Sequence, residues 1–122
     1  MGDFTHTLTV IGPQGEESVE AVVDTGAFFS WIPATILQRL GVQPTRRIPL
    51  RLADGRVIEH DAGEARVRID GNEQTTMCVF GDEGSDPLLG AYTLEGFLLA
   101  ADPVNGELIP RIARAVSPRL AQ

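Results

Sequence analysis

The segment Val22-Val23-Asp24-Thr25-Gly26-Ala27 joins an apolar strand to a polar loop. Just upstream, Val19, Ala21 and Val23 alternate with polar residues, which is typical of a strand that buries one face. Because this strand runs directly into Asp24, the sequence predicts that an acidic side chain is delivered into a loop at the end of a strand.

Short alternating segments flank this strand on both sides, and turn signals separate them. They are residues 4–11 upstream and residues 48–52, 57–58, 65–69, 75–80, 97–101 and 107–109 downstream. The pairs Asp54-Gly55 and Asp70-Gly71 are typical of tight turns, so a hairpin is predicted around each. A helix is predicted between Pro33 and Gly41, and residues 91–95 suit one helical turn. The pattern as a whole predicts an all-β fold with one short helix.

The chain has 122 residues, of which 43% are hydrophobic, and this predicts a globular domain. Its formal net charge of −7 argues against nucleic acid as a partner. All ten basic residues are arginine, which excludes Schiff-base and P-loop chemistries that depend on lysine.

We assign residues 1–110 to the domain. The tail at residues 111–122 has three arginines and no acid, and is predicted to be disordered or else to lie along the acidic body or along a second subunit.

The single cysteine, Cys78, can form no internal disulfide, which is typical of a reducing compartment. The first residues have neither the basic start nor the apolar stretch of a signal peptide. No segment approaches the roughly 18 apolar residues that span a bilayer. We therefore expect a cytoplasmic protein that has no membrane partner.

The motif at residues 22–27 resembles the active-site signature of retroviral-type (retropepsin-like) aspartic proteases. The order of later segments strengthens the resemblance: Ser30 lies three residues after Ala27, the Asp54-Gly55 hairpin comes next, and Leu88-Leu89-Gly90 follows. This order is similar to the family's active-site loop, flap hairpin and apolar-apolar-Gly segment. The resemblance implies a retropepsin-like closed barrel with a flap hairpin, acting as a homodimer on peptide or protein substrates with no cofactor or metal.

Peptide hydrolysis by this chemistry needs two carboxylates held so close together that both cannot ionise. Since the chain has one Asp-Thr-Gly, the second carboxylate is expected from Asp24 of another copy. Gly26 would allow the two loops to approach, and the Thr25 hydroxyl would hydrogen-bond across the dimer axis. The resemblance places Leu89 and Gly90 beneath the loop as its support.

The resemblance also assigns residues that contact a peptide substrate. They are Ala27, Phe28 and Phe29 in the active-site loop, and Ala53, Asp54, Gly55 and Arg56 in the flap hairpin. Phe28 and Phe29 stand where many retroviral members have acidic residues, and two adjacent aromatics favour either apolar substrate side chains or an occluded cleft. The C-terminal residues 97–109 are expected to form a hairpin, where the viral enzymes end in a single interface strand.

Two other functions stay open at this stage. One is a retropepsin-like binding or scaffold module that does not cleave because Phe28 and Phe29 occlude its cleft. The other is a β-barrel ligand binder in which the Asp24 motif is coincidental and the aspartate caps a turn.

The remaining candidate groups have simpler structural interpretations. Trp31 is expected in the core, and Cys78 is expected to be a buried thiol rather than a nucleophile. His6 and His60 have no partners at metal-ligand spacing. The acids Asp82, Glu83 and Asp86 suit a solvated turn better than a calcium loop.

Overall fold

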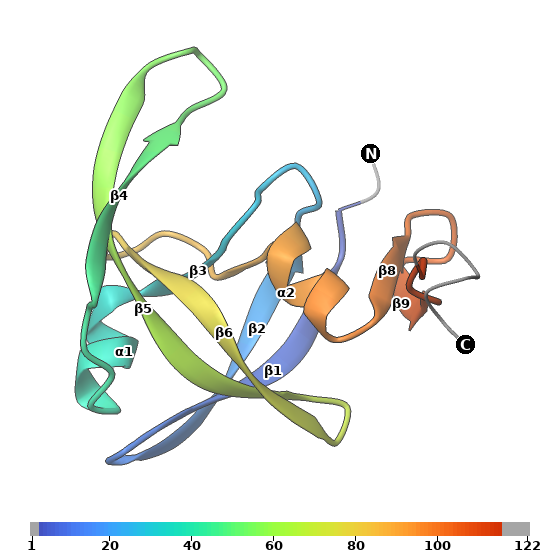
Figure 1. Ribbon diagram of the computed structural model, residues 1–122, viewed down its shortest axis with the longest axis horizontal. Coiled ribbons are helices and arrows are strands. Elements are labelled where there is room, and N and C mark those ends of the chain that lie inside the picture. Colours follow the sequence, from blue (N-terminus) through green and yellow to red (C-terminus); the bar gives the residue numbers. More distant parts are fainter. Residues whose placement is uncertain (1–2, 116–122) are drawn as a thin grey trace.

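The computed structural model describes residues 3–115, and within them nine strands and two short helices are formed (Figure 1). The strands are β1 (Thr5–Gly12), β2 (Gly15–Val23), β3 (Ser30–Pro33), β4 (Arg46–Arg51), β5 (Val57–Ile69), β6 (Asn72–Gly81), β7 (Leu88–Leu89), β8 (Leu99–Asp102) and β9 (Glu107–Pro110). The helices are α1 (Ala34–Arg39) and α2 (Ala91–Gly96). The prediction of an all-β class is confirmed.

The number of helices differs from the sequence prediction, which has one. Helix α1 lies where expected, directly after Pro33, and buries Leu37. The helical turn expected at residues 91–95 is a second helix, α2, whose final hydrogen bonds run from the Phe97 N–H to the Thr93 oxygen and from the Leu98 N–H to the Glu95 oxygen. Because these bonds hold Phe97 and Leu98 at the helix end, the strand expected at residues 97–101 begins only at Leu99.

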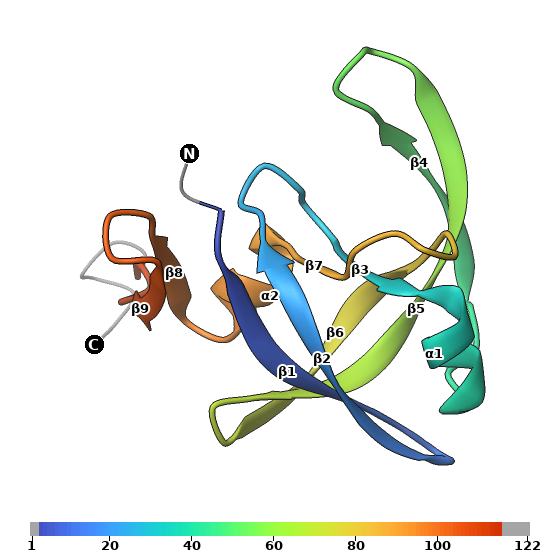
Figure 2. The ribbon, with the colours of Figure 1, turned by 180° about the vertical axis from the view of Figure 1, so that it is seen from behind.

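Six strands form a ring in the order β1, β2, β7, β3, β6 and β5, and β5 pairs again with β1 to close it. The β2–β7 and β3–β6 pairs are parallel, whereas β1–β2 and β5–β6 are antiparallel hairpins (Figure 2). Strands β3 and β7 have only four and two residues, too short for an alternating pattern to reveal them. The ring therefore contains two strands that the alternation of residues in the sequence does not predict.

The interior of the ring holds the main hydrophobic core. Alternate residues of the long strands point into it, as expected from the sequence: Leu8 and Val10 of β1, Val19, Ala21 and Val23 of β2, and Ala65, Val67 and Ile69 of β5. Burying a side chain of this size contributes about 1.5–3 kcal/mol, so this core is the main source of stability.

One long strand, β5, serves two parts of the molecule. Residues 57–62 pair with β4, and residues 62–69 pair with β6. The β4 strand and residues 57–62 form the flap hairpin, which projects from the ring in Figure 1. A second, smaller hydrophobic cluster of Ile48, Ala62 and Val79 lies at its base, with Phe29 and Trp31 packed against it. The flap hairpin is thus anchored next to the loop that carries Asp24.

The C-terminal segment forms a separate two-stranded sheet, β8–β9, at the side of the molecule away from the flap hairpin (Figure 1). This agrees with the hairpin predicted there. The predicted disorder of the tail concerns mostly residues 116–122, which lie outside the described residues. Within residues 3–115, no helix is long and apolar enough to cross a membrane.

Candidate active site

Asp24 follows the last residue of β2 and begins a tight turn. Its backbone N–H donates to the Leu89 oxygen at 3.0 Å, which ties the end of β2 to β7. The Gly26 N–H donates to Asp24 Oδ1 at 2.9 Å, and the Ala27 N–H donates to the Asp24 carbonyl at 3.1 Å. The Gly26 N–H thus orients the carboxylate of Asp24, which is half-buried.

The segment after β7 supports this loop from below. The Ala91 N–H donates to the Ala27 oxygen at 2.9 Å, and the Tyr92 N–H donates to the Phe28 oxygen at 2.8 Å. At Gly90 the two segments approach so closely that a Cβ atom would lie 2.5 Å from the Phe29 oxygen and 2.9 Å from the Ala27 oxygen. Only glycine fits there, and Leu89 beside it is fully buried.

A buried chain of hydroxyl groups fixes the same contact. Ser30 Oγ accepts the Gly90 N–H at 3.0 Å and lies 2.7 Å from Thr93 Oγ1, which in turn lies 2.8 Å from Thr76 Oγ1. All three hydroxyl residues are at most 5% exposed. Because buried polar groups are costly unless paired, this network holds β3, β6 and α2 in one arrangement under the loop.

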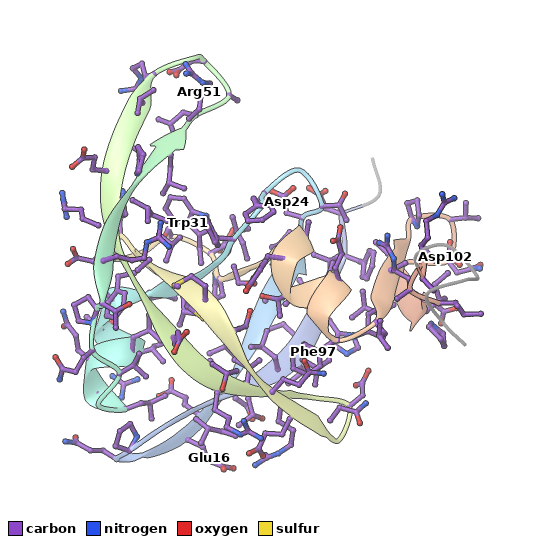
Figure 3. The ribbon with its side chains drawn as sticks, viewed as in Figure 1. Glu16, Asp24, Trp31, Arg51, Phe97 and Asp102 are labelled. Carbon is purple, nitrogen blue, oxygen red and sulfur yellow. The ribbon has the colours of Figure 1, made fainter. Side chains whose placement is uncertain are left out.

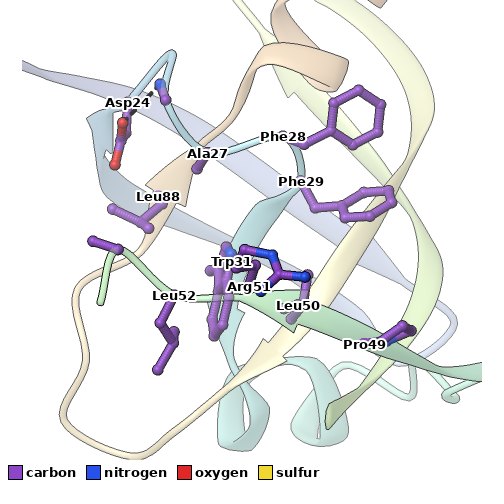
Figure 4. A pocket seen from close by; sticks show the side chains of 12 residues that line it. Asp24, Ala27, Phe28, Phe29, Trp31, Pro49, Leu50, Arg51, Leu52 and Leu88 are labelled. Carbon is purple, nitrogen blue, oxygen red and sulfur yellow. Dashed lines mark hydrogen bonds between the residues drawn. The ribbon is translucent and has the colours of Figure 1, made fainter. Parts of the chain in front are cut away.

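Asp24 opens onto a pocket of about 500 Å³ between the loop and the flap hairpin (Figures 3 and 4). The loop contributes Asp24, Gly26, Ala27, Phe28 and Phe29 to the wall, and the flap hairpin contributes Pro49, Leu50, Arg51, Leu52 and Ala53; Trp31 and Leu88 complete it. The structure therefore brings together five of the loop residues predicted from sequence and one flap residue, Ala53.

The aromatic residues at this pocket form a cluster. The Phe28 and Phe29 rings meet edge-on with centroids 4.8 Å apart, and Tyr92 of α2 packs on both. Phe28 is 60% exposed, so it belongs to the pocket and its rim rather than to the core. Trp31, expected in the core, is only partly buried and lines the pocket, and its ring lies tilted against that of His60 with centroids 5.1 Å apart.

The rest of the predicted flap residues lie away from the pocket wall. Asp54, Gly55 and Arg56 form the exposed tip, where the Arg56 Nε donates to Asp54 Oδ2 at 2.8 Å. The backbone N–H and guanidinium of Arg56 hold the pKa of the Asp54 carboxyl below its ordinary value. Gly55 has a φ of 92°, a left-handed conformation that favours glycine at the turn.

Sequence reasoning missed the flap residues just before the tip. Pro49, Leu50, Arg51 and Leu52 line the pocket, and β4 is an edge strand that pairs with β5 alone among the described strands. The alternation of Leu50 and Leu52 signalled a buried face, but the pocket on the open edge of the strand depends on how the hairpin bends over the loop.

Thr25 lies on a different side of the turn from the pocket. It is exposed and lines two smaller hollows, one with α2 and β8 residues such as Leu94 and Ala100, and one with Phe4 and Pro103. The threonine therefore faces the C-terminal hairpin, away from the flap hairpin.

The other candidate groups have structural roles. Cys78 is 1% exposed, and burial raises the pKa of its thiol to about 12, which confirms a buried thiol. His6 Nε2 lies 3.0 Å from Asp70 Oδ1, and His60 Nε2 lies 3.2 Å from Asp82 Oδ1. In the part of the chain that the structure describes, no three metal-ligating side chains come together.

Comparisons with known proteins agree with this fold. The family model described as "gag-polyprotein putative aspartyl protease" matches residues 13–96, a range that includes the Asp24 motif, the flap hairpin and Gly90. No curated protein matches the sequence. The match over the motif removes the support for a ligand binder in which Asp24 is coincidental.

Two solved structures have a similar fold. The protease of simian foamy virus (mac), determined in solution, has 14% sequence identity and a TM-score of 0.56, and the match covers 76% of this chain and 93% of that one. The EIAV protease, solved with the inhibitor HBY-793, has 16% identity and a TM-score of 0.56, over 76% of this chain and 86% of that one. At these identities the likeness establishes the fold alone. With the family match over most of its length and the fold of retroviral proteases around Asp24, this chain belongs to the retropepsin-like gag-polyprotein aspartyl protease family.

Proposed function

We propose that this protein is an aspartic endopeptidase whose active site is completed by a second copy of the chain. The observation that carries the proposal is the position of Asp24: its loop is held by main-chain hydrogen bonds, and its carboxylate borders a pocket of about 500 Å³ that the flap hairpin covers. A pocket of this volume accommodates side chains of an extended peptide.

A single carboxylate is not sufficient for this chemistry, because the water needs a base and the carbonyl oxygen needs an acid at the same time. Asp24 of a second copy, related by a two-fold axis beside the loop, supplies the missing group. The two carboxylates then share one proton, since both cannot ionise at hydrogen-bond distance.

The reaction conserves this shared proton. The ionised Asp24 takes a proton from a water molecule, whose oxygen attacks the peptide carbonyl carbon, while the protonated Asp24 donates its proton to the carbonyl oxygen. The resulting tetrahedral intermediate is not covalently linked to the protein. Its collapse breaks the C–N bond: the Asp24 that took the water proton gives it to the leaving nitrogen, and the other Asp24 takes a proton from a hydroxyl of the intermediate, so the pair again holds one proton.

The surface next to Thr25 suits the second copy. Thr25 is exposed on the side of the C-terminal hairpin, where its hydroxyl is free to bond across the two-fold axis. The same segment exposes apolar side chains at Leu98, Val104, Ile109 and Ile112. Exposed apolar side chains that gather on one segment are typical of an interface, and association would bury them.

In the dimer, the flap tip is expected to complete the substrate contacts. Ala53 already borders the pocket, and Asp54, Gly55 and Arg56 lie at the exposed end of the hairpin, from which closure would bring them over a bound peptide. The edge of β4 has unpaired main-chain groups on this side, which suits pairing with an extended peptide.

The competing function is a binding or scaffold module that does not cleave because Phe28 and Phe29 occlude the cleft. Occlusion requires the two rings to fill the space next to Asp24. The pocket stays open in the single chain with both rings on its wall, which favours the enzyme.

The test compares the wild-type chain with Asp24→Asn, using a peptide mixture at several pH values from acid to neutral, mass spectrometry for new termini, and sedimentation for the assembly. We expect cleavage by wild type, none by Asp24→Asn, and a dimer in both. Asp70→Asn is the matched control, because it makes the same change in a distant hairpin turn where asparagine is well accommodated. Equal cleavage by Asp24→Asn would refute the catalytic assignment, and peptide binding without cleavage would support the binding module.

A further inference from the structure

The pocket beside Asp24 has a second charged residue, Arg51. Of the described residues that line it, Asp24 and Arg51 are the ionisable ones, and the others are glycine, alanine, proline and large apolar residues. Arg51 comes from the last position of β4, just before the flap tip, and its guanidinium lies among the labelled pocket residues in Figure 4. The pocket is therefore lined mostly by apolar residues, with an acid on the side of the Asp24 loop and a cation on the side of the flap hairpin.

The charge of Arg51 is not neutralised within the chain as described. Its Nη1 donates to the Gly55 oxygen at 3.0 Å, and no carboxylate among residues 3–115 lies within salt-bridge distance of it. The neighbouring flap arginines are different: Arg47 pairs with Glu59 and Asp61, and Arg56 pairs with Asp54. A guanidinium has five N–H donors, so one bond to a carbonyl leaves Arg51 able to bind a carboxylate through two more.

This positive charge is local. The flap hairpin, residues 46–62, contains four arginines and three acids, whereas the whole chain has a formal net charge of −7. In an acidic protein, a cationic flap hairpin over an apolar pocket distinguishes between peptides by their charge, since complementary charges across an interface mainly set specificity.

We propose that Arg51 selects peptide segments in which an acidic side chain lies near a large apolar side chain. The inference rests on the proposed function and names the substrate class of the same site. Phe28, Phe29 and Leu50 form the wall that takes the apolar side chain, and the Arg51 guanidinium takes the carboxylate in a paired geometry that a glutamine cannot reproduce. The contact with Gly55 holds the guanidinium at the end of the hairpin, so that it moves with the flap tip.

The experiment measures kcat/KM for peptide pairs that differ only by Glu or Gln at one position, with that position moved along the peptide. Wild type should prefer Glu by up to about 5-fold at one position, as expected for an exposed ion pair. Arg51→Gln should abolish this preference. Arg46→Gln is the matched control: Arg46 is exposed at the other end of β4, does not line the pocket, and has no ion pair among residues 3–115, so the preference should persist.

The outcomes separate this inference from the proposed function. If peptides are cleaved but Glu and Gln are equivalent at every position, the selectivity inference is wrong while the endopeptidase stands. A uniform loss of kcat/KM in Arg51→Gln, with an unchanged Glu preference, would show that the side chain only braces the flap tip. If no Asp24-dependent cleavage is found, fluorescence anisotropy of the same labelled peptides with Asp24→Asn decides: tighter binding of Glu peptides, lost in Arg51→Gln, supports the inference, and equal binding overturns it.

Discussion

Gly90 is the position where one added methyl group should do most harm to the candidate site. In Gly90→Ala the new Cβ would lie 2.5 Å from the Phe29 oxygen, 2.6 Å from the Phe29 carbonyl carbon and 2.9 Å from the Ala27 oxygen. All three are backbone atoms, so no side-chain rotation relieves the clash. Either the segment after β7 or the Asp24 loop must move away.

The cost follows from the contacts that such a movement stretches. Overpacking a filled site costs about 1–3 kcal/mol. The movement also strains the hydrogen bonds from Gly90 to Ser30 and from Ala91 to Ala27, each worth about 1 kcal/mol. We expect the free energy of unfolding to fall by about 2–4 kcal/mol, or Tm by about 6–20 °C for a domain of this size.

The assay is thermal and urea unfolding at one fixed protein concentration, because association with a second copy would contribute to the measured stability. Gly96→Ala is the matched control: it lies in the same helix-containing segment, and its Cβ would meet only Gln74 Oε1 at 3.9 Å. That variant should be unchanged or more stable by up to about 1 kcal/mol. If Gly90→Ala and Gly96→Ala have the same free energy of unfolding, the close approach of Gly90 does not support the Asp24 loop.

Three further predictions address other contacts. Ser30→Ala leaves the Gly90 N–H without its acceptor in a buried site and should lower the free energy of unfolding by about 1–3 kcal/mol in urea titrations. Burial raises the pKa of Cys78 from 9.0 to about 12, so the folded chain keeps the thiol proton longer; its contribution to stability should be complete below pH 9 and decline towards pH 12, a slope that should be absent in Cys78→Ala. Val104→Asp places a charge at an 89% exposed apolar position of the C-terminal hairpin and should raise the dimer dissociation constant, measured by sedimentation, at least 10-fold. Gln14→Glu, in the β1–β2 turn on the far side of the molecule from that hairpin (Figure 1), should leave the dissociation constant unchanged. A dissociation constant unaffected by Val104→Asp would show that the dimer interface lies elsewhere.

Local features of the chain were sufficient for much of the ring. The alternation of Val19, Ala21 and Val23 determined which face of β2 is buried, because successive side chains of a strand point to opposite sides. The pair Asp70-Gly71, both with positive φ, determined the β5–β6 turn. The buried face of β2 and the β5–β6 turn both depend on residues close together in the sequence, so the residue pattern is enough to predict them.

The candidate site depends partly on local sequence and partly on tertiary structure. Asp24 and Gly26 were evident from the motif, because the loop geometry around a carboxylate is a local property. Trp31 was expected in the core and Arg51 was not expected at the site, yet both line the pocket. Their positions result from the flap hairpin bending over the loop, which no alternation within β4 encodes.

By itself, the sequence determined the strand faces, the hairpin turns and the acidic residue at the end of β2, since each follows from residue type and short-range spacing. Only the tertiary structure decided the parallel β2–β7 and β3–β6 pairs, the closure of β1 on β5, and the turning of Thr25 away from the pocket. Those features join residues far apart in the chain, and which strands meet is set by the burial of a shared core.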